Sequence, residues 1–289
     1  SSLFSDSCSF GSKLMKSLLP LITVSLILLF RSGINAQNTE NSEFGPAIED
    51  NSMFVEEAYN QEDRVVQHIS NLVLLPVGEK NIYYSFTQEW PAFGLKHQLS
   101  YTLQYYSISR ADVSGFGDIL LNYRYQLWYK QNFVAFSPRV SLVIPTGNHA
   151  KRLGDGSWGL QFNLPVSKRW TNHFINHFNL GATYFFKVKQ EEIDFSRSMV
   201  SYFGGLSSIW LMTEKTNLML ECMTYYIANP DVDNKVSYTN ETILAPGFRH
   251  AIDLKKLQIV PGITVPFSLS KEEGNKVGLF FYLSFEHPY

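Results

Sequence analysis

The stretch of residues 132–170 reads NFVAFSPRVSLVIPTGNHAKRLGDGSWGLQFNLPVSKRW, and its rhythm decides the fold class. Between residues 134 and 144 every second residue is apolar or proline, whereas the opposite face is mostly small or polar and carries Arg139. A period of two residues is that of a β-strand. After a loop rich in Gly, Asp, Asn and Lys at 146–157, the alternation resumes at 160–167, so the stretch predicts an antiparallel hairpin with one apolar and one polar face.

Such a hairpin fits two architectures. In a soluble sandwich the apolar face is the core, and in a membrane barrel it meets lipid while the polar face lines the lumen. Composition favours the barrel: 45% of the 289 residues are hydrophobic, 15% are aromatic and only 17% are charged, against roughly 25% charged residues in soluble domains. The net charge of −2 and the absence of a Lys/Arg cluster predict no nucleic-acid partner.

From residue 64 onward the alternation recurs in segments of roughly ten residues between turn signals, the length of a membrane-spanning strand. The expected strands are 64–76, 81–90, 97–110, 117–129, 132–145, 157–168, 174–187, 199–212, 217–228, 238–251, 257–269 and 278–289. An even number is usual in single-chain outer-membrane barrels. The predicted fold is all-β, a closed antiparallel transmembrane β-barrel of about 12 strands over residues 64–289.

The connections between these strands give a second test, because outer-membrane barrels have long outer loops and short periplasmic turns. The expected outer loops are 111–116, 146–156, 188–198, 229–237 and 270–277, and the expected inner turns are 91–96, 130–131, 169–173, 213–216 and 252–256. Long and short connections mostly alternate, although the short first hairpin around residues 77–80 fits least well.

The N-terminal region predicts export. Met15 and Lys16 precede an apolar run at 18–30, which is shorter than the roughly 20 residues of a spanning helix. Residues 15–36 are therefore expected to be a signal peptide cleaved after Ala36, with residues 1–14 an artefact upstream of a true start at Met15. An uncleaved N-terminal anchor is the alternative. The expected location is the outer membrane of a Gram-negative bacterium.

Residues 37–63 are polar and acidic, with an acidic run at 56–63. One interpretation is a solvated periplasmic extension. The other is a plug that enters the barrel lumen and contacts basic side chains there.

Polar and charged side chains on the inward files of the strands are the candidate lumen lining, because a charge facing lipid costs about 2–4 kcal/mol at the midplane. These residues are Asp118, Asn122, Arg124, Gln126, Arg139, Glu221 and Arg249. The candidate constriction loop comprises Thr146, Gly147, Asn148, Gly154, Asp155 and Gly156. The lining has two interpretations: a salt-bridge network that stiffens a small barrel, or a selectivity filter that a passing solute meets.

No motif predicts enzyme chemistry, a cofactor or a metal site: the chain has no G-x-S-x-G, H-E-x-x-H or Walker sequence. His173 and His177 are four residues apart, which in a strand separates them by about 13 Å. Cys8 lies ahead of the expected signal peptide, so the mature chain would hold Cys222 as a lone thiol. The expected protein is not an enzyme, although a membrane-embedded hydrolase with a Ser–His pair at the lipid face is one alternative.

The segment SPRVSLVIPTG at 137–147, with LGDG at 153–156 and LPVSK at 164–168, resembles an outer-membrane family labelled "MetA-pathway of phenol degradation". The resemblance covers roughly residues 115–186. It implies an outer-membrane channel or transporter for small, often hydrophobic, solutes, and the phenol label itself is not carried over. The alternative is a closed structural or adhesive barrel.

The C-terminal strand adds a second resemblance. Leu279, Phe281, Leu283 and Phe285 alternate, and the chain ends on Tyr289. This is similar to the aromatic-ended last strand that outer-membrane barrels present to their assembly machinery. Expected partners are therefore membrane lipid, that machinery through the C-terminal strand, and small-molecule solutes.

Overall fold

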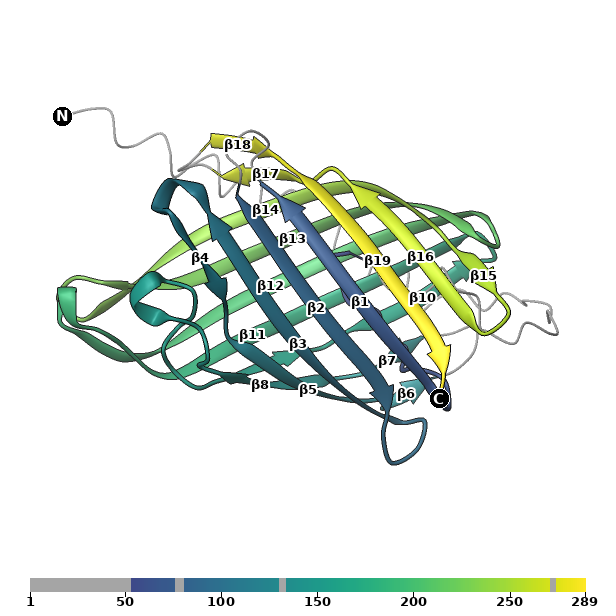
Figure 1. Cartoon of the computed structure of the whole chain (residues 1–289), viewed down its shortest axis with the longest axis horizontal. Coiled ribbons are helices and arrows are strands. Elements are labelled where there is room, and N and C mark those ends of the chain that lie inside the picture. The colour runs from purple at the N-terminus through teal and green to yellow at the C-terminus, as the bar shows by residue number, and fades with distance from the viewer. Residues whose placement is uncertain (1–52, 76–80, 130–133, 271–273) are drawn as a thin grey trace. The chain divides into compact units, whose positions relative to one another are not determined.

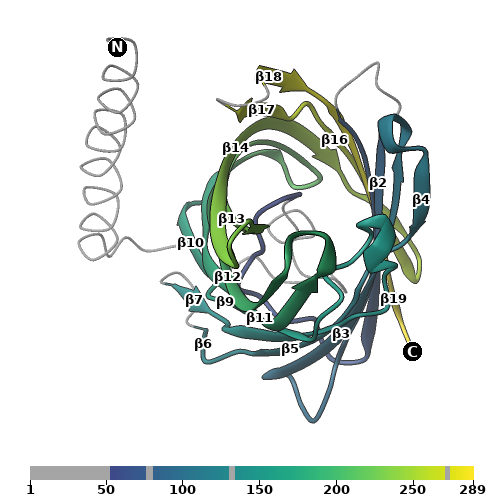
Figure 2. The same cartoon turned by 90° about the vertical axis from the view of Figure 1, so that its left-hand side faces the viewer.

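The computed structural model describes residues 53–75, 81–129, 134–270 and 274–289, which form one antiparallel β-sheet closed on itself (Figures 1 and 2). The expectations for residues 1–52, including the signal peptide, lie outside the described residues. Three short 3₁₀ turns interrupt the sheet: η1 (Ser109–Ala111), η2 (His149–Lys151) and η3 (Glu191–Ile193). No helix among the described residues is both long and apolar enough to cross a membrane.

The labelled strands within the described ranges form 12 crossings of the barrel wall, which are called staves here. Six staves are single continuous strands, and six consist of two or three strands separated by short irregular stretches. The continuous staves are β1 (Val65–Leu74), β2 (Ile82–Pro91), β3 (His97–Ile108), β11 (Phe174–Gln190), β12 (Phe195–Thr213) and β13 (Thr216–Asp231). The broken staves are β4 (Val113–Phe116) with β5 (Ile119–Tyr125) and β6 (Trp128–Tyr129); β7 (Ala135–Phe136) with β8 (Arg139–Ile144); β9 (Gly159–Asn163) with β10 (Val166–Thr171); β14 (Lys235–His250) with β15 (Ile252–Leu254); β16 (Leu257–Thr264) with β17 (Phe267–Ser270); and β18 (Gly274–Val277) with β19 (Leu279–Pro288).

Each stave pairs antiparallel with its neighbours in sequence, and the first and last staves close the ring. The closing register runs from Val65 opposite Pro288 to Leu74 opposite Leu279. Closure removes the free edge that an open sheet would expose to lipid. The predicted closed antiparallel barrel of about 12 strands is confirmed.

The barrel has apolar side chains on its outside and polar side chains on its inside, which is the reverse of a soluble domain. In soluble domains charged side chains are almost never fully buried unless they are paired. Large apolar side chains cover the outer surface, among them Leu180, Tyr202, Trp210, Leu218, Leu220 and Phe281. Polar and charged side chains are buried inside, among them Gln67, Glu89, Gln98, Arg124, Glu221 and Arg249. This is the arrangement of a barrel whose outer face meets lipid.

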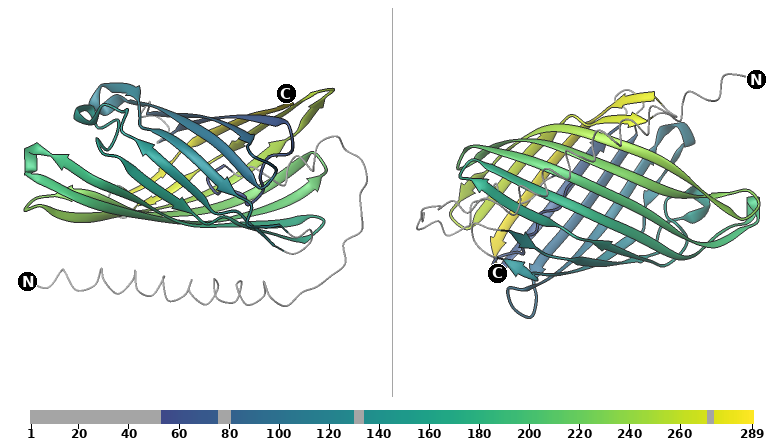
Figure 3. Two further views of the ribbon diagram at one scale, coloured as in Figure 1. Left: turned by 90° about the horizontal axis from the view of Figure 1, so that it is seen from below. Right: turned by 180° about the vertical axis from the view of Figure 1, so that it is seen from behind.

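One wall of the barrel is longer than expected. The strands β11 to β14 have 17, 19, 16 and 16 residues, and Figure 3 shows this wall reaching beyond the opposite strands. The expected long loops at 188–198 and 229–237 were wrong, because most of these residues belong to the strands. An inward apolar cluster that includes Val188 and Phe195 stabilises the extension.

Candidate functional site

Two arginines face each other on the inner wall of the barrel. Arg124 on β5 and Arg139 on β8 are direct partners in the antiparallel register, so their side chains leave the sheet on the same face. Arg124 is 3% exposed and Arg139 is 15% exposed. Like charges directly opposite each other destabilise a strand pair. The pair therefore needs an anion beside it.

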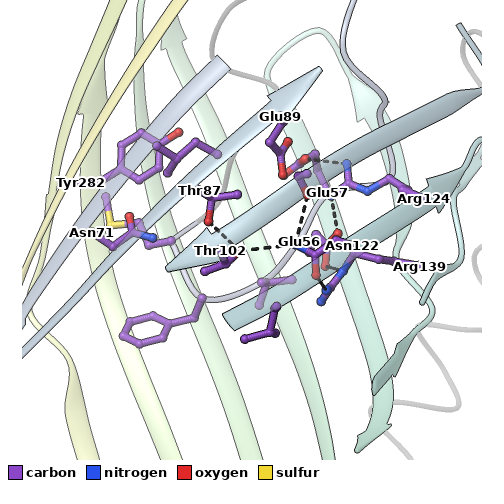
Figure 4. Close-up of a pocket in the computed structure, with 16 residues that line it drawn as sticks. Glu56, Glu57, Asn71, Thr87, Glu89, Thr102, Asn122, Arg124, Arg139 and Tyr282 are labelled. Atoms are coloured by element: carbon purple, nitrogen blue, oxygen red, sulfur yellow. Dashed lines mark hydrogen bonds and ion pairs between the residues drawn. The ribbon is translucent and has the colours of Figure 1, made fainter. Parts of the chain in front are cut away.

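Glu56 supplies that anion, as Figure 4 shows. Its Oε1 accepts a hydrogen bond from Arg124, and its Oε2 lies 2.8 Å from Nε of Arg139 and 2.7 Å from Nδ2 of Asn163. Burial by itself raises the pKa of Glu56, but the positive charges of Arg139 and Arg124 outweigh it and lower the pKa to about 2. At neutral pH the carboxylate is ionised and bridges both guanidinium groups.

The two guanidinium groups are held in different ways. Nη1 of Arg124 donates to the carbonyl of Tyr59 at 2.8 Å and to Oε1 of Glu57 at 3.2 Å, both ahead of the first strand. Arg139 is oriented by the wall itself: its Nη1 lies 3.0 Å from Oδ1 of Asn122 and its Nη2 lies 3.0 Å from Oε1 of Gln161. The orientation of Arg139 thus has support independent of Glu56.

Glu56 belongs to residues 53–63, which run inside the ring of strands and are called the inner segment here (Figure 2). This segment contains no strand or helix, so its buried backbone groups need partners elsewhere. Side chains of the wall supply several of them. The wall contacts are Asn179 Oδ1 with Glu56 N at 2.8 Å, Ser167 Oγ with Ala58 N at 2.7 Å, Ser137 Oγ with Ala58 O at 2.8 Å, Gln126 Oε1 with Asn60 N at 3.1 Å, and Gln98 Oε1 with Gln61 N at 2.8 Å.

Glu221 on β13 holds the first residues of the inner segment. Its carboxylate accepts from three consecutive backbone N–H groups, at 3.1 Å from Met53, 3.0 Å from Phe54 and 3.2 Å from Val55. Successive N–H groups that converge in this way form an anion-binding concavity. Here the backbone supplies the concavity and the wall supplies the anion.

Apolar contacts complete the fit at the same level of the barrel. Met53 packs in a buried cluster with Ile209, Met219 and Val260. The ring of Phe54 meets the ring of Phe280 edge to face, with centroids 4.9 Å apart, a favoured aromatic geometry. The inner segment therefore fills this part of the lumen with both polar and apolar contacts.

A cavity of about 210 Å³ remains between the inner segment and a wall formed by β1, β2, β3, β5, β8 and β19 (Figure 4). Both arginines, Glu56 and Glu57 lie on its lining. The rest of its surface is mixed, with apolar, hydroxyl and amide side chains and the carboxylate of Glu89. The other wall residues are Ile69, Asn71, Thr87, Ser100, Thr102, Leu120, Asn122 and Tyr282.

The structure brings some of the predicted lining residues together and separates others. Asn122 joins the arginine pair through Arg139. Gln126 contacts the inner segment at Ala58 and Asn60. Glu221 lies with residues 53–55, and the buried Arg249 lies over the ring of Tyr282 at 5.7 Å.

Asp118 has a different role from the other predicted lining residues. Its carboxylate accepts hydrogen bonds from the backbone N–H groups of Gly147 at 2.8 Å and Asp155 at 2.9 Å. It therefore anchors the predicted constriction loop to the start of β5. Thr146 adds a bond from its Oγ1 to the carbonyl of Gly117 at 3.1 Å.

The rest of that loop folds compactly beside the anchor. Asn148 caps η2 by accepting from the N–H of Lys151, and Gly156 adopts a φ of +64°, which glycine tolerates at no steric cost. A Cβ on Gly154 would overlap the Asp118 carboxylate. Burial and the nearby Asp118 raise the pKa of Asp155 to about 6. That the loop constricts the lumen stays a prediction.

A Ser–His pair does exist, on the lumenal side. Ser167 Oγ lies 2.7 Å from Nδ1 of His177, and both side chains are buried. Ser167 also accepts from Ala58 of the inner segment, so this pair does not meet the lipid-facing hydrolase considered from sequence. Among the described residues no group of three His, Cys, Asp or Glu side chains could hold a metal ion.

Sequence reasoning named the acidic run at 56–63 but did not assign Glu56 to the site. It also missed Asn163, Ser167 and Asn179. Asn163 and Ser167 occupy the polar file of the quoted hairpin, so period-two alternation places them on the lumenal face. No local pattern indicates that Glu56 lies between the two arginines, because its contacts with them span 68 and 83 residues.

The closed sheet, the apolar outer face and the polar interior define a transmembrane β-barrel. The fold is similar to that of an outer membrane channel from Pseudomonas putida F1, with a TM-score of 0.62 and 15% identity over 80% of this chain and 98% of that one. It is also similar to the NanC porin, with a TM-score of 0.51 and 6% identity over 78% and 100% of the two chains. The KdgM porin, solved in complex with disordered oligogalacturonate, gives 0.50 and 8% identity over 77% and 99%. No protein-family model and no curated protein matches the sequence.

Proposed function

We propose that this protein is an outer-membrane channel for small organic solutes, and that the inner segment closes it. The observation that carries the proposal is the way residues 53–63 occupy a polar lumen. Several of their contacts are hydrogen bonds and ion pairs to wall side chains, and water can replace such bonds when the segment leaves.

The remaining parts of the proposal follow from sequence and fold. The resemblance at residues 115–186 supports small solutes with an apolar body. Export by a signal peptide at 15–36, residence in the outer membrane of a Gram-negative bacterium, and assembly through β19 belong to the same proposal. The outward file of β19, which includes Leu279 and Phe281, supports the last of these.

A barrel closed permanently by the same segment is the second candidate, and the extent of the contacts around Glu221 and Met53 favours it. The two candidates differ in one property only, which is whether the inner segment can leave its position.

A reversible lock on the inner segment tests the proposal. A Cβ built on Gly205 lies 3.0 Å from Cγ2 of Val55, and in a disulfide each Cβ lies about 3 Å from the partner sulfur. The double variant V55C/G205C, with Cys8 and Cys222 replaced by serine, is therefore expected to form a disulfide. The flexible thioether of Met223 must shift to make room.

Single-channel current in planar bilayers is the measurement. We expect current steps from the reduced protein, none after oxidation, and recovery on addition of a reductant. V55C alone, treated identically, controls for effects of the redox reagents. Equal currents before and after oxidation, with the disulfide shown by mass spectrometry, would contradict gating by this segment. Silence of both forms, from folded and inserted protein, would favour the permanently closed barrel.

A further inference from the structure

We propose that the pair Arg124–Arg139 is a binding site for small organic carboxylates, and that Glu56 occupies this site in the closed state. The inference rests on the channel function proposed above and adds to it a class of solute. It also gives the channel a trigger, because a carboxylate that binds the pair displaces the inner segment.

The first argument is the geometry around the Glu56 carboxylate. Both of its oxygens are bound by wall donors, Oε1 by Arg124 and Oε2 by Arg139 and Asn163. Guanidinium groups and ionised carboxylates form the strongest hydrogen bonds available to side chains. Beyond its Cβ, a glutamate side chain is an acetate group. The wall thus already holds the chemical group that we assign to the solute.

The second argument is that part of the site belongs to the wall alone. Asn122 and Gln161 orient the guanidinium of Arg139 from neighbouring positions in the sheet. Asn163 lies directly opposite Arg139 in the register of β8 and β9. A site whose donors are positioned before the ligand arrives loses less conformational entropy on binding.

The third argument is the balance of charge around the cavity. With the inner segment in place, its lining holds two arginines against Glu56, Glu57 and Glu89, a formal charge of −1. Removal of the inner segment takes away Glu56 and Glu57 and leaves +1. The buried Nε of Arg124 makes no hydrogen bond among the described residues. This N–H group can therefore donate to a bound solute.

The fourth argument is space for the remainder of a solute. The cavity of about 210 Å³ opens beside the carboxylate. Ile69 and Leu120 give it an apolar side, and Thr87 and Thr102 give it hydroxyl groups. A short organic acid can place its carboxylate between the arginines and its body in this cavity.

Thiol labelling of the Val55→Cys variant tests the site without relying on current. Val55 is 1% exposed, so a thiol at this position reacts only when the inner segment leaves. The full chain is used, with Cys8 and Cys222 replaced by serine. Acetate is expected to raise the labelling rate about fivefold or more. Neither acetamide nor chloride at the same ionic strength should do so, and chloride controls for screening.

In the variant Glu56→Ala, made in the V55C chain, acetate is expected to change the labelling rate in the opposite direction. Alanine keeps the Cβ and removes the acetate portion of the side chain, which leaves the two arginines without their bridge. Thiol labelling at position 55 should start fast in this background. Added acetate should slow it, because a free carboxylate restores the bridge and lets the segment dock.

Arg139→Gln should abolish both effects of acetate, and Arg139→Lys should weaken acetate about 10- to 100-fold, because an ammonium group cannot bind a carboxylate in the place of Nε and also keep the bonds to Asn122 and Gln161. Lys215→Gln, at an exposed ion pair in a turn, is the matched control. Acetate effects of opposite sign in the two backgrounds support the site. No effect of acetate, or an equal effect of chloride, overturns it. The labelling results do not depend on whether the disulfide-locked and reduced barrels differ in current. The labelling assay therefore tests the carboxylate site, and the current measurement on V55C/G205C tests the channel function independently.

Discussion

Replacement of Glu56 by glutamine isolates the ion pairs that hold the inner segment. The amide keeps the shape of the side chain but removes the charge shared by Arg124 and Arg139. Breaking a buried ion pair costs about 3–5 kcal/mol. The lower end applies here because Glu56 and Arg139 are still 18% and 15% exposed. A loss of about 3 kcal/mol shifts the equilibrium between docked and released segment by about 150-fold.

Thiol labelling at position 55 of the V55C chain measures that shift directly. When opening and closing are fast relative to the chemistry, the labelling rate is proportional to the released population. We therefore expect the rate for V55C/E56Q to exceed that for V55C by about 150-fold. Asp63→Asn is the matched control within the same segment, because Asp63 is 76% exposed and its pair with Arg64 spans 4.0 Å. Such surface pairs contribute little.

A small effect would refute the reasoning. If E56Q changed the labelling rate by less than about threefold, as expected for D63N, the two arginines would not depend on Glu56 for their charge balance. Thermal unfolding of the barrel, followed by the heat-dependent shift in gel mobility, shows separately that the variant is folded.

Three other measurements test other parts of the structure. Glu221→Gln should raise the labelling rate of the V55C chain about 10- to 100-fold, because three backbone N–H groups lose a charged acceptor. The pH dependence should follow Glu56: its lowered pKa of about 2 means that the docking that it contributes is fully present above about pH 4.5 and weakens as pH falls toward 2. The labelling rate of V55C, divided at each pH by the rate of a free model thiol to remove the change in thiolate fraction, should therefore rise below about pH 4.5. Gly154→Ala should displace the loop at 146–156, because its Cβ would overlap the Asp118 carboxylate; faster protease cleavage in that loop, with an unchanged barrel, checks this.

The barrel could be predicted from sequence because its information is local. Alternation along residues 132–170 gives the strands, and each strand pairs with its neighbour in the chain, so no distant partner has to be guessed. The lengths of β11 to β14 were underestimated. The residues near η3 are polar and charged, as in a loop, but inward Val188 and Phe195 continue the strand pattern on one face only.

The site was half predictable for the same reason. Arg124 and Arg139 could be placed on the lumenal face from the two-residue alternation of their strands. Their direct pairing depends on the register between β5 and β8, and the position of Glu56 depends on a segment without periodic structure. Hydrogen bonds between irregular backbone and distant side chains leave no repeat in the sequence.

The direct pairing of Arg124 with Arg139 has a consequence for how this sequence can vary. Either arginine alone would leave Glu56 with half of its compensation, and Glu56 alone would be a buried anion. The three positions, separated along the chain by 68 and 83 residues, are therefore expected to be substituted together during evolution. Among homologous barrels, a lineage that loses one of these side chains is expected to have replaced the other two as well.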